Sequence, residues 1–172
     1  DIGSNTGKFT KAALSYNNQV LVTMVDLPQQ IAMAQKNPDL FGFKDRIETF
    51  PTNILNAGEE LPSNVDTVWM SQFLDCFSLD EVQRILRKIK KYVPSHCNIF
   101  VLEPLWDMQR FEAASYSIQA TSIYFAAMAN GNSKMYSYSD LVSAIEAAGC
   151  SLVCAHHNLG INSYSLLQFR VS

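Results

Sequence analysis

Short apolar runs alternate with amphipathic stretches along the chain. Apolar and β-branched residues make up positions 20–25 and, apart from Asp66, positions 65–70, and the run 98–103 ends in a carboxylate. Between such runs, apolar side chains recur three and four positions apart, which is typical of helices that pack on a sheet. This exchange of strand and helix patterns predicts an α/β fold.

The pattern predicts strands at 20–25, 47–50, 65–70, 98–103, 151–155 and 164–171, the last two as a hairpin-like pair. Helices are expected after Gly7, from Pro28, from Ser78 to Val93, from Asp107 to Ala129 and from Ser139 to Gly149. Ser78 and Glu81 have the spacing of a capping box, in which each side chain bonds the other residue's backbone N–H. The helix 107–129 is weakly charged and rich in aromatic residues, so we expect protein to cover most of its sides.

The first seven residues read as the end of a strand, a glycine turn and the start of a helix. Gly3 and Gly7 lack the Cβ that would keep a ligand away from the backbone. The turn also directs the N–H groups of the first helical residues towards whatever binds there. Because Asp1 stands where the last residue of that strand is expected, we expect the first strand to be incomplete in this chain.

An acidic residue, Asp26, ends the apolar run 20–25, about twenty residues after the glycine turn. A carboxylate at the tip of the second strand can accept hydrogen bonds from two ribose hydroxyls, so we expect the ligand to be a nucleoside. In dinucleotide-binding folds a glycine stands at the position that Asn5 occupies here. The spacing therefore counts against a nicotinamide-dependent oxidoreductase, and the chain has no phosphate-binding Lys-Ser/Thr pair.

The composition of the chain argues against several classes of binding partner. The net charge of −3 lacks the basic footprint of a nucleic-acid-binding protein. No run reaches the roughly 18 apolar residues that a membrane span needs. The four cysteines lack the spacing of a zinc site, so we expect free thiols and a cytoplasmic location. His156 and His157 have no acid or cysteine at ligand spacing, and we expect no metal site there.

The form D-x-G-x-x-x-G over residues 1–7 resembles the first motif of the class I methyltransferases that use S-adenosylmethionine. The tripeptide Asp26-Leu27-Pro28 narrows the resemblance to small-molecule O-methyltransferases of the caffeate and hydroxyindole type, over essentially the whole chain. The resemblance implies a Rossmann-like, doubly wound and mostly parallel sheet of seven strands, with one strand antiparallel and the first truncated. Residues 1–172 would then form the cofactor-binding, catalytic domain.

The same resemblance implies a reaction and a set of partners. A methyl group would pass from S-adenosylmethionine to a hydroxyl of a small acceptor, aromatic acceptors included, and S-adenosylhomocysteine would be released. Members of this family carry an N-terminal helical domain that dimerises. We therefore expect a homodimer that forms through a region absent from this chain.

The resemblance also places the cofactor contacts. They fall at Asp1, Gly3, Asn5, Gly7, Asp26, Leu27, Asn53, Ile54, Ser71, Gln72 and Phe77. In such enzymes a polar side chain at position 53 meets the exocyclic amine of adenine and an apolar one at 54 packs on the ring. The family more often has aspartate where Asn53 stands, and an amide oxygen can accept the same hydrogen bond.

The catalytic position departs from the family pattern. Where these enzymes hold a histidine base, this chain has Asp75, and Glu103 matches a position that holds a carboxylate near the base. Three interpretations follow. In the first, Asp75 is the base and burial raises its pKa; in the second, the acceptor is acidic enough, or carries a nitrogen or a carboxylate, to need less assistance from a base. In the third, the domain binds the cofactor without catalysing methyl transfer. The last alternative would give the chain a regulatory or scaffolding role.

Overall fold

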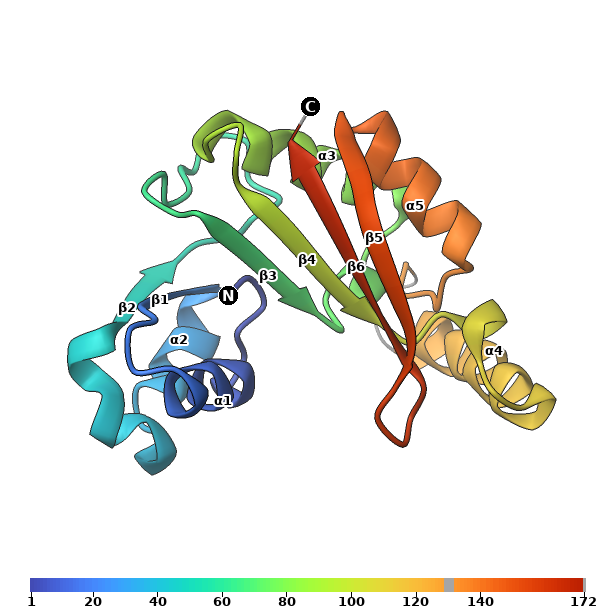
Figure 1. Ribbon diagram of the computed structural model, residues 1–172, viewed down its shortest axis with the longest axis horizontal. Helices are drawn as coiled ribbons and strands as arrows, with labels where there is room; N and C mark the ends of the chain where they lie inside the picture. The colour runs from blue at the N-terminus through green and yellow to red at the C-terminus, as the bar shows by residue number, and fades with distance from the viewer. Residues whose placement is uncertain (129–131, 172) are drawn as a thin grey trace. The chain divides into compact units, whose positions relative to one another are not determined.

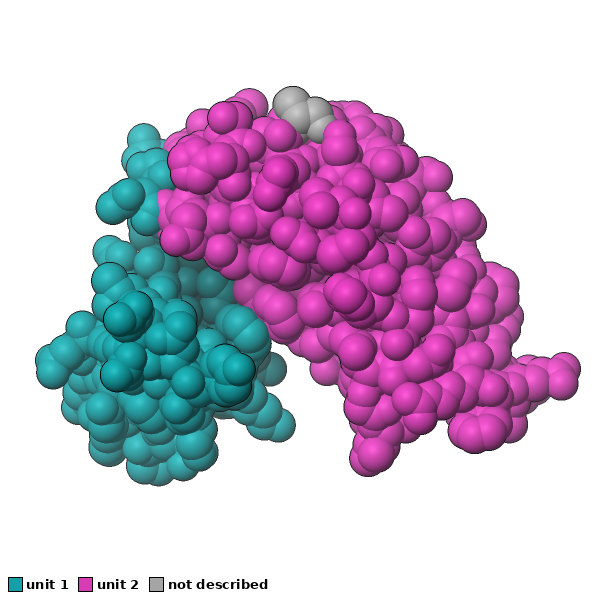
Figure 2. All heavy atoms as spheres, viewed as in Figure 1, with its two compact units in different colours: residues 1–64 teal, residues 65–172 magenta. Residues whose placement is uncertain are grey.

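The computed structural model describes residues 1–128 and 132–171, and the chain divides into two compact units. Unit 1 comprises Asp1–Asn64 and unit 2 comprises Val65–Ser172 (Figure 2). Each unit has its own sheet and its own helices, so each is described by itself.

Unit 1 is a small parallel sheet with helices (Figure 1). Its elements are α1 (Lys8–Tyr16), β1 (Val22–Asp26), α2 (Pro28–Ala34), the 3-10 helix η1 (Pro38–Arg46) and β2 (Ile47–Pro51). Strands β1 and β2 are parallel, with Val22 opposite Ile47. The core consists of Leu14, Val22, Met24, Ile31, Ala34 and Leu40. Pro28 stands in the first turn of α2, where its missing N–H costs no hydrogen bond.

Unit 2 is a four-stranded mixed sheet with helices (Figure 1). Its strands are β3 (Thr67–Ser71), β4 (Asn98–Glu103), β5 (Cys150–Leu159) and β6 (Tyr164–Val171). Its helices are α3 (Leu79–Tyr92), α4 (Glu112–Met128), α5 (Tyr138–Ala147) and the short 3-10 turns η2 (Leu74–Cys76) and η3 (Trp106–Met108). The strand order is β3-β4-β6-β5, with β3 parallel to β4 and β6 antiparallel to both of its neighbours.

The mixed α/β fold with parallel strands is confirmed, but the expectation of one seven-stranded sheet is wrong. The described residues form six strands, in sheets of two and four. The segment expected as the truncated first strand makes only an isolated parallel bridge between Ile2 and Val25. This segment makes two hydrogen bonds to Val25: the Val25 N–H donates to the Asp1 carbonyl, and the Gly3 N–H donates to the Val25 carbonyl. Two bonds are too few to form a strand ladder.

The long aromatic helix also differs from expectation. It begins at Glu112 rather than Asp107, because residues 106–108 form the separate turn η3, and its expected end at Ala129 lies outside the described residues. None of its residues is buried, so the expected cover is wrong for the part of the chain that the structure describes. Within residues 1–128 and 132–171, no helix has the length and apolar character needed to cross a bilayer.

Candidate functional site

The glycine loop of unit 1, residues 1–7, turns through backbone conformations that most side chains disfavour. Gly3, Asn5 and Gly7 have φ values of 72°, 48° and 81°. The Gly7 N–H donates to the Ser4 carbonyl at 2.8 Å, which closes the turn just before α1 begins. Asparagine adopts this left-handed conformation more readily than most residues, so the turn can form with Asn5 in place of a glycine.

Side chains hold the glycine loop at both ends. A Cβ at Gly7 would lie 2.7 Å from Leu40 Cδ1 and 3.2 Å from Met24 Cε, so the core of unit 1 leaves no room for a side chain there. At the other end, the Asp1 carboxylate accepts a hydrogen bond from the buried Thr10 hydroxyl at 2.7 Å. The loop is therefore fixed to α1 and to the core.

Asp26 lies at the carboxyl end of β1, beside the glycine loop. Its Oδ2 accepts a hydrogen bond from the Asn5 N–H at 2.7 Å, and its Oδ1 accepts one from the Leu27 N–H at 2.7 Å. A carboxylate oxygen has two acceptor positions, so each oxygen can accept one more bond. The Leu27 side chain is exposed next to this carboxylate.

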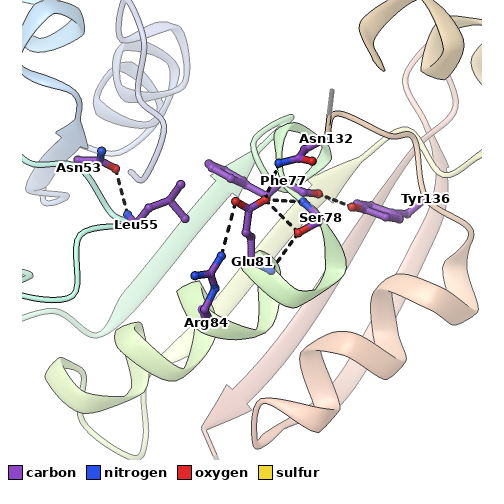
Figure 3. Close-up of polar contacts among 8 residues, drawn as sticks. All are labelled: Asn53, Leu55, Phe77, Ser78, Glu81, Arg84, Asn132 and Tyr136. Atoms are coloured by element: carbon purple, nitrogen blue, oxygen red, sulfur yellow. Dashed lines mark hydrogen bonds and ion pairs between the residues drawn. The ribbon is translucent and has the colours of Figure 1, made fainter. Parts of the chain in front are cut away.

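A second loop of unit 1, residues 52–56, follows β2 and lies against the end of β1. The Thr52 N–H donates to the Asp26 carbonyl at 2.9 Å. Asn53 Oδ1 accepts the Leu55 N–H at 3.1 Å (Figure 3), a turn that asparagine often makes with the backbone two residues on. Ile54 is buried.

Glu59 organises this second loop, and the sequence patterns did not point to it. Its Oε2 accepts hydrogen bonds from the Thr52 hydroxyl and from the Asn53 N–H, the latter at 2.7 Å. Its Oε1 accepts the side-chain amide of Asn56 at 2.7 Å. The only signal in the sequence is an acid close to several loop donors, which many loops share.

In unit 2, the loop 72–78 leaves the carboxyl end of β3 through a sharp turn. Ser71 ends β3, and Gln72 follows with a φ of 48°, unusual for a residue that is not glycine. The Gln72 N–H donates to the Leu102 carbonyl at 2.9 Å, which ties the turn to β4. Its side chain is exposed, while Ser71 is half-buried.

Glu103 supports this loop from the end of β4. It is 2% exposed and continues the buried row that Ile99 and Val101 form along the strand. Its Oε1 accepts the N–H groups of Phe73 at 3.0 Å and Leu74 at 2.9 Å. No residue that the structure describes donates a hydrogen bond to its other oxygen, Oε2. A buried carboxyl oxygen without a donor favours the protonated form.

Asp75 and Glu103 influence each other's protonation. Burial raises the pKa of Glu103 well above its ordinary value of 4.5, and the nearby negative charge of Asp75 raises it further. Burial also raises the pKa of Asp75, against the opposing effect of hydrogen bonds from Cys76 and the local backbone. Both carboxyls therefore hold a proton to higher pH than exposed ones, and the Asp75 carboxylate is a stronger base than an ordinary aspartate.

Phe77 lies in this loop just before Ser78, the capping residue of α3. Its ring packs edge-to-face on Phe73, with the centroids 4.9 Å apart. The predicted capping box is confirmed: the Ser78 N–H donates to Glu81 Oε2 at 2.9 Å and the Glu81 N–H donates to Ser78 Oγ at 3.3 Å (Figure 3). The Phe77 carbonyl accepts a hydrogen bond from the Tyr136 hydroxyl.

Tyr136 is the second residue that sequence reasoning missed. It lies 59 residues from Phe77 along the chain, and no local spacing rule connects positions so far apart. The bond forms because the segment before α5 returns to the loop that follows β3, which only the folded topology reveals.

The histidines and cysteines form no comparable cluster. His157 Nδ1 lies 2.8 Å from Ser165 Oγ, and the ring of His157 contacts Tyr138. Across residues 1–128 and 132–171, no group of three or more histidine, cysteine or acidic side chains could hold a metal ion. The four cysteines are in the thiol form rather than joined in disulfides: Cys76, Cys97, Cys150 and Cys154.

The expected site residues thus fall into two groups, one in each unit. In unit 1 the structure brings together the glycine loop, Asp26 and the loop with Asn53. In unit 2 it brings together Asp75, Glu103 and the loop 72–78, which carries Phe77.

Comparison with protein-family models identifies the kind of domain. Residues 1–149 match the family model described as an O-methyltransferase domain. Comparison with curated protein sequences gave no match.

Solved structures resemble the chain over its whole length. The mitomycin 7-O-methyltransferase MmcR has a TM-score of 0.85 at 22% identity, and the match covers 100% of this chain and 48% of MmcR. An O-methyltransferase family 2 protein from Planctomyces limnophilus, solved with apigenin, has a TM-score of 0.83 at 16% identity, over 100% of this chain and 50% of that one.

A third similar structure is NcsB1, an O-methyltransferase from neocarzinostatin biosynthesis, solved with S-adenosylmethionine and 2-hydroxy-5-methyl naphthoic acid. Its TM-score is 0.82 at 17% identity, and the match covers 100% of this chain and 48% of NcsB1. The chain therefore spans about half the length of these solved structures. At such identities the similarity shows the fold alone.

Proposed function

The chain belongs to the O-methyltransferase domain family, and from this premise we propose that it transfers a methyl group from S-adenosylmethionine to a hydroxyl of a small acceptor. The observation that carries the proposal is the Asp26 carboxylate, anchored beside the glycine loop with acceptor positions left on both oxygens. S-adenosylhomocysteine is the expected product. NcsB1 has been solved with each of these two molecules, which supports the choice of donor.

The residues of unit 1 suit the adenosine part of this cofactor. Asp26 would accept hydrogen bonds from the two ribose hydroxyls, one on each oxygen. Gly3 would let the cofactor approach the backbone, since it carries no side chain. Gly7 would contribute through the turn that leads into α1, because a Cβ there would meet Leu40 and Met24 of the core. In the second loop, Asn53 would meet the exocyclic amine of adenine and Ile54 would contact the ring.

The roles that we propose for residues of unit 2 concern the methionine part, the adenine ring and the removal of the proton. Ser71 and Gln72 would contact the methionine part, and Phe77 would pack near adenine. Bound S-adenosylmethionine supplies an electrophilic methyl group. Asp75 would remove the proton from the acceptor hydroxyl as the oxygen forms its bond to carbon, and the electron pair of the broken carbon–sulfur bond would stay on sulfur.

Burial makes Asp75 better suited to this task than an exposed aspartate. A general base works best when its pKa lies near the working pH, and burial raises the pKa of Asp75 in that direction. Glu103 would act as a positioning residue, because it fixes the backbone on the approach to Asp75 through the N–H groups of Phe73 and Leu74. We propose an aromatic hydroxyl as the acceptor, since proteins of this fold have been solved with apigenin and with naphthoic acids.

Calorimetric titration of S-adenosylhomocysteine tests the cofactor assignment. We expect micromolar binding by the wild-type chain and at least tenfold weaker binding by Asp26→Ala, equivalent to about 1.4 kcal/mol. Asp26→Asn, which keeps one acceptor oxygen, should lie between the two. The matched control is Asp45→Asn, at an exposed acid of unit 1 outside the glycine loop, which should bind as the wild type does. Equal binding by all variants, or a preference for NAD, would reject the proposal.

Methyl transfer itself is tested with radiolabelled S-adenosylmethionine and a panel of small phenols. Asp75→Asn should retain S-adenosylhomocysteine binding and lose transfer by about 100-fold or more, as expected when a general base is removed. Binding without transfer by the wild type to any phenol would instead favour a cofactor-binding domain with a regulatory role.

A further inference from the structure

We propose that Tyr136 is a positioning residue that holds the Phe77 carbonyl and thereby fixes the loop 72–78 in the arrangement that binds the cofactor. The inference rests on the proposed function and adds a residue that neither the sequence patterns nor the family resemblance pointed to. Its basis is a set of hydrogen bonds between the segment 132–136, here called the strap, and the loop that carries Asp75.

Hydrogen bonds connect the strap to the loop and to the helix that follows it. The Lys134 N–H donates to the Asp75 carbonyl at 2.8 Å, and the Tyr136 hydroxyl donates to the Phe77 carbonyl. The side-chain amide of Asn132 donates to Glu81 Oε2 at 3.4 Å (Figure 3). The contacts thus reach both sides of Phe77.

The strap is itself anchored at its other side. The Tyr136 carbonyl accepts the Trp106 N–H at 3.2 Å, and the Met135 N–H donates to the Ser122 hydroxyl of α4 at 3.0 Å. Tyr136 is 3% exposed, so its ring has little freedom to move. A hydroxyl fixed in this way can impose a position on the carbonyl that it bonds.

The loop has limited means of holding these carbonyls by itself. Within the turn η2, the Cys76 N–H donates to the Phe73 carbonyl and the Phe77 N–H donates to the Leu74 carbonyl. Glu103 holds two N–H groups at the start of the loop. The carbonyls of Asp75 and Phe77 take no part in these bonds, and the strap supplies their donors.

The chemistry of Tyr136 suits a permanent donor. Burial raises the pKa of Tyr136 to about 12, with a further contribution from the negative charge of Asp75. The hydroxyl therefore keeps its proton throughout the physiological range and always donates to the Phe77 carbonyl. Phe77 is the residue proposed to pack near adenine, so a loss of this bond should be felt first in cofactor binding.

The test compares Tyr136→Phe with Tyr138→Phe. Both changes remove one tyrosine hydroxyl, and Tyr138 is half-buried two residues further on, where its ring contacts His157. The first readout is amide hydrogen exchange in a peptide that spans residues 73–78, without ligand. Loss of the hydrogen bond to the partly buried Phe77 carbonyl should speed exchange there about fivefold or more in Tyr136→Phe and leave Tyr138→Phe like the wild type.

The second readout is the Kd for S-adenosylhomocysteine, measured well below the melting temperature, where a loss of global stability alone leaves Kd unchanged. We expect Tyr136→Phe to weaken binding about three- to tenfold and Tyr138→Phe to have no effect. Unchanged exchange in the loop would overturn the inference, whatever the cofactor result. Faster exchange with unchanged Kd would also overturn it, because the loop would then not need Tyr136 to bind. Failure of the wild type to bind would refute the proposed function, and the exchange result would still decide whether Tyr136 holds the loop.

Discussion

Single side chains decide the electrostatics of unit 2, and Glu103 has the largest part in them. It brings an ionisable group to the end of a strand whose inward side is otherwise apolar, and only one of its oxygens has donors among the described residues. The folded state therefore prefers the protonated carboxyl. This preference makes stability depend on pH in a direction opposite to that of a salt-bridged acid.

The prediction at Glu103 concerns that pH dependence. Burial and Asp75 raise the pKa of Glu103 above its ordinary 4.5, so the folded state binds more protons than the unfolded state from about that pH upward. The free energy of unfolding should then fall as pH rises through this window. Glu103→Gln keeps an acceptor oxygen but cannot titrate, so the fall should be shallower. Urea unfolding at a series of pH values between 4 and 8 measures this change in the free energy of unfolding.

Glu60→Gln is the control for this experiment, because Glu60 is an exposed acid in unit 1. Its unfolding curve should follow that of the wild type across the whole series. If Glu103→Gln and the wild type lose stability in parallel as pH rises, Glu103 is not held in its protonated form by the fold.

A second residue-scale prediction concerns Cys76. Partial burial and the nearby Asp75 carboxylate raise the pKa of Cys76 to about 12. Since only the thiolate reacts, this partly exposed cysteine should react slowly with iodoacetamide at pH 8. Asp75→Asn removes the negative charge and should speed alkylation several-fold, as measured by mass spectrometry of the peptide. Asp80→Asn, at an exposed acid in the first turn of α3, is the control, and equal rates in all three proteins would contradict the prediction.

At the scale of elements, sequence patterns were most informative where a rule is local. The spacing of Ser78 and Glu81 predicted a capping box, and the apolar run before Asp26 predicted a strand. Residues 38–46 were missed, because a 3-10 helix such as η1 has no strong periodic signal. The contact between Tyr136 and Phe77 could not be predicted from the sequence, since it depends on how elements that are distant in the chain pack together.

The turn between the glycine loop and α1 gives a prediction at this scale. At Gly7 the positive φ opposes a side chain, and so does Leu40, whose Cδ1 would lie 2.7 Å from an added Cβ. Gly7→Ala should therefore lower the free energy of unfolding by about 2 kcal/mol. Gly42→Ala is the matched control, because a Cβ there would meet nothing within 4 Å. Urea unfolding followed by circular dichroism measures both, and equal stability of the two variants would show that the core gives way.

At the scale of the whole molecule, the sequence patterns predicted the class of fold better than its extent. Alternating strands and helices indicated an α/β protein, which the structure confirms. The single sheet was wrong because the first segment supplies one bridge, at Ile2, in place of a strand. The exposure of α4 was also unexpected, since composition does not reveal whether a neighbouring element exists to cover an apolar helix.

The exposed side of α4 leads to the last prediction. Large apolar side chains there are exposed to solvent: Tyr116, Ile123, Tyr124, Phe125 and Met128. Apolar surface of this kind binds hydrophobic dyes, so the chain should enhance the fluorescence of anilinonaphthalene sulfonate. A double change of Ile123→Lys and Met128→Lys should reduce the signal at least twofold. Leu21→Lys, at an equally exposed residue of unit 1, should leave the fluorescence nearly unchanged. A larger loss of fluorescence in Leu21→Lys than in the double variant would contradict the prediction that the dye binds at α4.

The hydrogen bond from the Asn5 N–H to Asp26 links the loop to the carboxylate more closely than proximity alone would do. The Oδ2 that accepts the Asn5 N–H would also accept a hydrogen bond from a ribose hydroxyl. The chemical shift of the Asn5 amide proton would therefore change whenever a molecule binds to Asp26. A short charge-assisted bond of this kind shifts an amide resonance downfield. Asn5 thus gives the protein a native spectroscopic probe, one backbone proton that reports on occupancy without any label attached to the ligand.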